Sequence, residues 1–88
     1  MTNKQLLEKL QEDMEMRGFS HHTKYTYYHK AQEIIKYFGK PMKQVSTKEL
    51  RDYLMKYLRE KKLSERSVNY YNSIIRFIYD VVLDYPIN

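Results

Sequence analysis

The sequence predicts an all-α protein, a compact four-helix bundle, on the basis of three observations. Its 88 residues include two glycines, two prolines and 31% charged residues, a composition that favours helices over a sheet. Apolar residues recur every three or four positions in four segments, which is the period of one helix face. Short polar turns separate these segments. A chain of this length forms one domain with a modest core that needs no disulfide.

The first helix is expected from about Asn3 to Met16, and Gly18 is placed to provide its left-handed C-terminal cap. Four carboxylates against one lysine fall within residues 8–15, so we expect its outer side to be acidic and to face away from nucleic acid. Its buried stripe consists of Leu6, Leu7, Leu10 and Met14.

The second helix is expected to begin after Ser20, a favourable N-cap, and to end near Phe38, where Gly39 and Pro41 stop it. Residues 21–26 form its first two turns, where free backbone N–H groups favour an anion. Its buried side consists of Thr23, Tyr27, Ala31, Ile34, Ile35 and Phe38.

The third helix carries two capping signals at its start. Ser46 and Glu49 fit a capping box, and Val45 and Leu50 fit a hydrophobic staple around it. We expect the helix to continue to about Lys61. Its inward side consists of Leu50, Tyr53, Leu54, Tyr57 and Leu58.

The fourth helix is expected to open at Ser64, after a basic turn over residues 61–63, and to reach Leu83. Its core stripe consists of Val68, Tyr71, Ile75, Ile78 and Val82, and its opposite, polar stripe of Arg66, Asn69, Ser73 and Arg76. Arginine, asparagine and serine are side chains that hold phosphates or read base edges. Phe77 lies near this polar side, so we assign it to a partner surface. A helix end that wraps around the core is an equal alternative.

The charge of the chain is distributed unevenly. Its net value is +5, with five lysines against one glutamate in residues 20–43 and six basic against two acidic residues in residues 56–76. With the acidic segment near the N-terminus, this distribution suits a polyanion on one side of the molecule.

Several classes of function are excluded by what the sequence lacks. It has no cysteine, which excludes disulfides and thiolate metal sites. No apolar run is long enough to span a membrane or to form a signal peptide, so a cytoplasmic protein is expected. His22 and His29 are two turns apart rather than one, which does not fit a histidine metal site. With no Gly-rich phosphate loop and no nucleophile elbow, we expect a binding module without catalysis, cofactor or metal.

Two segments of the chain resemble a known family. Residues 20–27, Ser-His-His-Thr-Lys-Tyr-Thr-Tyr, are followed by apolar residues at helical spacing. Residues 63–69, Leu-Ser-Glu-Arg-Ser-Val-Asn, are followed by Ser-Ile-Ile-Arg-Phe-Ile-Tyr at residues 73–79. In this order and separation, the segments resemble the N-terminal domain of tyrosine recombinases, the phage integrase family. Ala31 and the Tyr70–Tyr71 pair depart from the family pattern.

This resemblance implies a SAM-like orthogonal bundle that serves as a core-binding domain, over residues 1–84. In such enzymes this domain forms one half of a clamp around double-stranded DNA. Residues 85–88 would begin the linker to a catalytic domain, which is absent here, and no catalytic residue of the family is placed in this chain. The implied partners are double-stranded DNA, the chain's own catalytic domain and other protomers in a recombination synapse.

The second and fourth helices are the expected DNA-binding elements, with their N-terminal halves toward the major groove. Arg66 and Arg76 would hold phosphates or guanine edges, and Asn69 would reach an adenine. The candidate DNA-binding residues are His22, Thr23, Lys24, Tyr25, Lys62, Arg66, Ser67, Asn69, Tyr70, Ser73 and Arg76. Two alternatives stay open: a helical protein-interaction module for an acidic partner, and a small transcriptional regulator of the helix-turn-helix kind.

Overall fold

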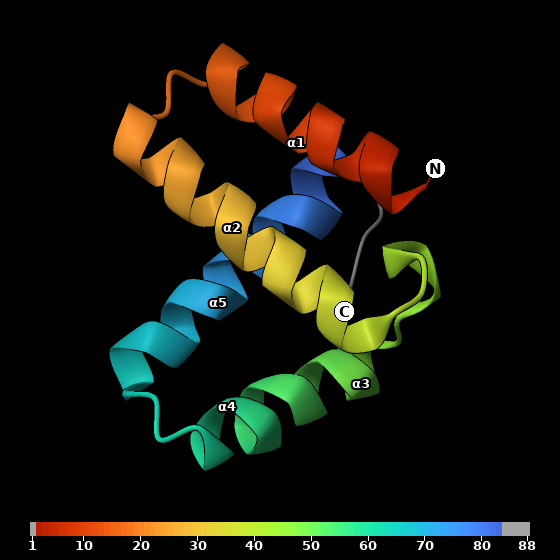
Figure 1. Ribbon diagram of the computed structural model, residues 1–88, viewed down its shortest axis with the longest axis vertical. Helices are drawn as coiled ribbons and strands as arrows, with labels where there is room; N and C mark the ends of the chain where they lie inside the picture. The colour runs from red at the N-terminus through yellow and green to blue at the C-terminus, as the bar shows by residue number, and fades with distance from the viewer. Residues whose placement is uncertain (1, 84–88) are drawn as a thin grey trace.

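The computed structural model describes residues 2–83, and within this range every element of regular secondary structure is helical (Figure 1). Three of the four predicted helices begin at the predicted caps, and all four are present. The elements are α1 (Asn3–Met16), α2 (His21–Phe38), the 3₁₀ turn η1 (Met42–Gln44), α3 (Thr47–Asp52), the π-helical turn η2 (Tyr53–Tyr57), α4 (Leu58–Glu60), α5 (Glu65–Phe77) and the π-helical turn η3 (Ile78–Val82). Because α3, η2 and α4 follow one another directly, they form the predicted third helix, and α5 with η3 forms the fourth.

The last helix lies at the centre of the bundle. α1 and α2 pack side by side, and α5 crosses behind α2, while its continuation η3 reaches α1 (Figure 1). η2 contacts α5 from the other side. The helix α3–η2–α4 therefore lies at the opposite end of the molecule from α1. The predicted all-α, four-helix architecture is confirmed, and the predicted linker at residues 85–88 lies outside the described residues.

Local hydrogen bonds fix the helix boundaries. Ser20, Ser46 and Ser64 each accept a hydrogen bond from the backbone N–H three residues later, as predicted. Thr2 forms a full capping box with Gln5, which the sequence analysis missed. At the helix ends, Gly18 and Gly39 have φ angles of 71° and 64°, the left-handed region that glycine adopts without a steric penalty.

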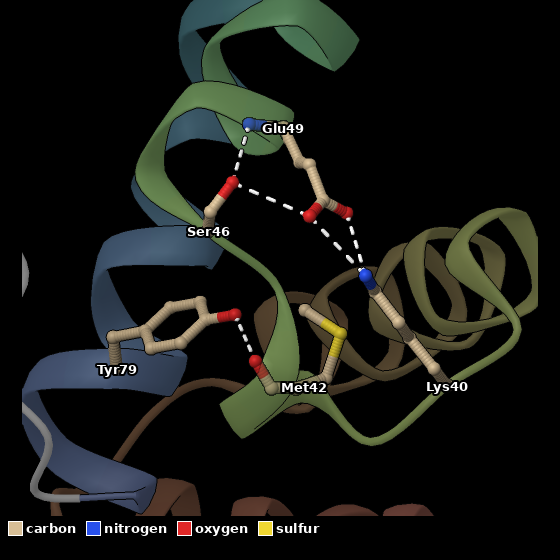
Figure 2. Close-up of polar contacts among 5 residues, drawn as sticks. All are labelled: Lys40, Met42, Ser46, Glu49 and Tyr79. Atoms are coloured by element: carbon tan, nitrogen blue, oxygen red, sulfur yellow. Dashed lines mark hydrogen bonds and ion pairs between the residues drawn. The ribbon is translucent and has the colours of Figure 1, made fainter.

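The capping box predicted at Ser46 forms only in part (Figure 2). Ser46 Oγ accepts from the Glu49 N–H at 3.1 Å, but the Glu49 carboxylate turns to Lys40, 2.9 Å away, and to the Ser46 hydroxyl. The lysine holds the pKa of the Glu49 carboxyl below its usual value. Here a tertiary ion pair competes with the local motif for the same carboxylate.

The core contains the predicted stripes together with residues that the helical period did not indicate. Ile74 and Tyr79 of the last helix and Met42 of η1 are almost completely buried. Tyr79 donates a hydrogen bond from its hydroxyl to the Met42 carbonyl, which joins η3 to η1 across 37 positions of sequence (Figure 2). The last helix is thus buried around more of its circumference than one stripe, because it packs against neighbours on several sides.

Phe77 packs within the domain, which confirms the alternative that this helix end wraps around the core. Its ring lies 5.3 Å from the ring of Phe19 and 5.9 Å from that of Tyr27, with the Arg17 guanidinium 5.8 Å from its centroid. The loop between α1 and α2 places Phe19 over the end of α5, so this helix end wraps into the core. A single-helix projection does not include that loop.

Three buried tyrosines differ in the partners of their hydroxyl groups. Tyr71 donates to the Glu33 carboxylate at 2.7 Å, and Tyr79 donates to a backbone carbonyl. The Tyr53 hydroxyl is buried without a hydrogen-bond partner among residues 2–83. Burial raises the pKa of Tyr53 and of Tyr71 well above the usual value, and the Glu33 charge raises both further.

Replacing Tyr79 and Tyr53 by phenylalanine should separate a hydroxyl that has a partner from one that has none. Tyr79→Phe removes one of the two hydrogen bonds to the Met42 carbonyl, which still accepts from the Val45 N–H, so it should lower the free energy of unfolding by about 0.5–1.5 kcal/mol. Tyr53→Phe removes an unsatisfied hydroxyl and should leave stability unchanged or raise it by about 1 kcal/mol. Urea unfolding followed by circular dichroism measures both. Equal destabilisation by the two variants would contradict this reading of the core.

Stability should also fall in alkaline solution. The pKa values of Tyr53 and Tyr71 are higher in the folded state than in the unfolded chain, where tyrosines titrate at about 10. As pH rises, the unfolded chain therefore loses these protons first, and the folded state becomes less stable relative to it. The stability from both groups is therefore complete below about pH 10 and decreases as pH rises further. Urea midpoints between pH 8 and roughly 11 test this. Tyr71→Phe should flatten the decrease, and an unchanged slope in that variant would contradict the assignment.

Candidate nucleic-acid interface

The N-terminal halves of α2 and α5 form the two walls of an open groove. On α2, successive turns contribute His22, Thr26 and Lys30, because these residues are four positions apart. On α5, the wall comes from the first two turns. The residues that line the groove are His22, Thr26, Lys30, Arg66, Ser67 and Tyr70. None of them is acidic, so an imidazole, an ammonium and a guanidinium face the same space without a carboxylate.

Beside this groove the two helices meet at an aromatic junction. Tyr27 of α2 meets Tyr70 of α5 edge to face, with ring centroids 5.6 Å apart. The Lys30 ammonium lies 4.5 Å from the centroid of Tyr71 and 5.9 Å from that of Tyr70. These contacts hold the Lys30 side chain in place by cation–π attraction while its charge stays available to the groove.

The outer ridge of α5 carries the polar stripe that the sequence predicts. Arg66, Asn69, Ser73 and Arg76 are all exposed. Ser73 Oγ donates to the Asn69 carbonyl at 3.1 Å, so its hydroxyl proton is used within the helix and its lone pairs remain free. Within residues 2–83 the three ion pairs all use lysines, which leaves the guanidinium groups of Arg66 and Arg76 without a carboxylate partner.

The comparisons with known proteins decide the family. The family described as phage integrase, N-terminal SAM-like domain, matches residues 6–88. The chain belongs to this family. "Putative integrase/recombinase y4qK" of Sinorhizobium fredii is 29% identical over 79 residues, which cover 90% of this chain and 26% of that protein. The chain thus spans about a quarter of that relative's length, and no solved structure matches it significantly. The resemblance to tyrosine recombinases is confirmed.

This SAM-like integrase domain brings only some of the predicted site residues together. His22, Arg66, Ser67 and Tyr70 line the same groove. Asn69 lies on the other side of the α5 ridge, where it faces the α4 side of the molecule. Arg76 likewise faces α3. The predicted stripe is therefore one exposed ridge with two different flanks.

Lys24 and Tyr25 lie apart from the groove, on the side of α2 that faces α1. Lys24 forms an ion pair with Glu15 of α1, and this lysine lowers the pKa of the Glu15 carboxyl. The Tyr25 ring packs on His29, with centroids 4.2 Å apart. The side chain of Thr23 takes part in the N-cap, since its Oγ1 accepts from the Ser20 hydroxyl. These three residues remain predictions for DNA contact, but they do not share a surface with Arg66.

Lys62 occupies the turn before α5 in a left-handed conformation, with φ of 59°. Its N–H donates to the Arg59 carbonyl at 2.8 Å, and its side chain is exposed beside the start of α5. Thr26 and Lys30 were missed by the sequence analysis. Their signal was present in the four-residue spacing from His22, which places all three on one side of α2.

The integrase domain contains no described helix that is long and apolar enough to cross a membrane. Within residues 2–83 no three His, Cys, Asp or Glu side chains group as a metal site would require. His22, Lys30 and Arg66 instead present an imidazole and two fixed positive charges to one open groove.

Proposed function

We propose that this domain is the core-binding part of a site-specific tyrosine recombinase and clamps duplex DNA during integration and recombination. The observation that carries the proposal is the groove between α2 and α5, where His22, Lys30 and Arg66 converge without a carboxylate. Groups of this kind hold backbone phosphates. Membership of the phage integrase family and a relative named as an integrase/recombinase support the same function.

In this proposal the groove positions the domain on the backbone and the α5 ridge reads the major groove. Arg66 and Lys30 hold phosphates, while Ser67, Ser73 and Tyr70 fix the register on the backbone. Asn69 reaches an adenine edge from the exposed ridge. Lys62 adds a positive charge at the start of α5.

The domain itself would carry no catalytic residue. Its further partners would be the catalytic domain of its own protein and other protomers in the recombination synapse. It would act on double-stranded DNA in the cytoplasm without a cofactor.

A titration with labelled duplex DNA at several salt concentrations tests the proposal. We expect a dissociation constant of roughly 10⁻⁴–10⁻⁶ M near physiological salt, an affinity that falls steeply as salt rises, and NMR amide shifts concentrated in residues 21–30 and 62–76. Absence of localised shifts even at low salt would overturn it. An acidic protein partner, as in the alternative of an interaction module, would then explain the basic face better.

Two substitutions should separate phosphate contact from base reading. Arg66→Gln should weaken binding to all duplexes and reduce the slope of log K against log salt by about 1. Asn69→Ala should cost about 1–3 kcal/mol on a cognate site and little on random DNA.

The matched control is Lys4→Gln, which removes the same unit charge from the exposed side of α1. It should change the salt slope much less than Arg66→Gln. An equal loss would show that the contact surface extends to the α1 side instead of ending at the groove.

A further inference from the structure

A second trough runs along the other flank of α5, between α5 and the continuous helix α3–η2–α4. It consists of two hollows in line, and Met55 lines both of them. The first hollow lies between Arg51 of α3 and Arg76 of α5. The second lies between Arg59 of α4 and Asn69 of α5. The α5 ridge is thus flanked by cationic side chains on both sides.

The π-helical turn η2 explains why two arginines of one helix line the same trough. In a regular α-helix, residues eight positions apart lie roughly 80° apart around the axis, at the two edges of one face. A π turn accommodates one additional residue. Arg51 and Arg59 are eight positions apart with η2 between them, and the π turn brings both toward α5.

The arginines of this trough are available for a ligand. Arg51, Arg59 and Arg76 are exposed, and none of them takes part in the ion pairs found within residues 2–83. Asn72 adds an amide to the first hollow, and Glu65 at one end is the one carboxylate among the residues that line the two hollows. The trough therefore offers several donors to an anion and few competing acceptors.

We propose that this trough holds the second strand of the same duplex. Arg51 and Arg59 contact phosphates of the strand opposite to the one held by His22, Lys30 and Arg66. A helix with its side chains is about 10–12 Å across, and the major groove is about 12 Å wide, so the elements that flank an inserted helix reach the two backbones. The inference rests on the proposed function and extends the interface to a helix for which the sequence indicated no DNA contact.

A nucleic acid fits the trough better than an acidic protein segment does. The trough shares Asn69 and Arg76 with the exposed ridge, so one continuous ligand covers both. Arginine and asparagine are the side chains enriched in contacts with DNA.

The test uses Arg51→Gln, Arg59→Gln and the double variant in the 88-residue chain, with a random-sequence duplex over a series of salt concentrations. Each single variant should reduce the salt slope by about 0.9, and the double variant by about 1.8, because one phosphate contact is lost per arginine. The control is Lys4→Gln on the exposed side of α1, which removes one charge and should leave the slope unchanged. Thermal unfolding checks that every variant remains folded.

The outcomes separate this inference from the proposed function. If the unchanged chain binds no duplex, the proposed function fails. If the chain binds and Arg66→Gln lowers the slope, while both α3–α4 variants behave like Lys4→Gln, the second-strand contact is overturned and the groove contact stands.

The Nε–H signals of Arg51 and Arg59 in NMR spectra provide a second measurement. Both signals should shift on addition of the duplex and move little with a poly-glutamate peptide of matched charge. Shifts with the peptide and none with the duplex would identify the trough as a protein-docking surface and overturn the proposal.

Discussion

The packing of the last helix against neighbours on several sides is the constraint on which the rest of the structure depends. α5 and η3 contact α1, α2 and η2, and the hydrogen bond from Tyr79 to the Met42 carbonyl fixes the C-terminal end against η1. Because α2 and η2 pack on two sides of α5, only the outer side of its N-terminal half is free. The ridge from Arg66 to Arg76 is exposed for this reason.

The helices and their ends were predictable because their signals are local. Ser20, Ser46 and Ser64 cap helices through backbone groups three residues away, and the apolar period marks each buried side. Features that depend on distant segments were not predictable. Tyr79 finds its acceptor 37 positions away, and Phe77 is covered by the loop that carries Phe19, so neither environment can be derived from one helix alone.

The candidate site was predictable to the same extent. The exposed ridge of α5 follows from helical period, and the structure has it as expected. The cationic side chains on the two flanks of this ridge do not follow from helical period, because their positions depend on the crossing of α5 with α2 and on the π turn η2. Lys30 joins Arg66 only through that crossing, and Lys24 lies on the side of α2 that faces α1, where Glu15 is its partner.

Lys62 shows what the connection into α5 requires. A residue other than glycine in the left-handed region costs roughly 1–2 kcal/mol, and glycine would adopt the same φ of 59° without that strain. The chain nevertheless has a long cationic side chain there, at the start of the helix that carries the ridge. Conformational stability and positive charge are therefore opposed at this position: Lys62→Gly would relax the backbone and at the same time remove an ammonium from the entrance to α5. An engineer who selected only for thermal stability would be led to that change and would lose the charge.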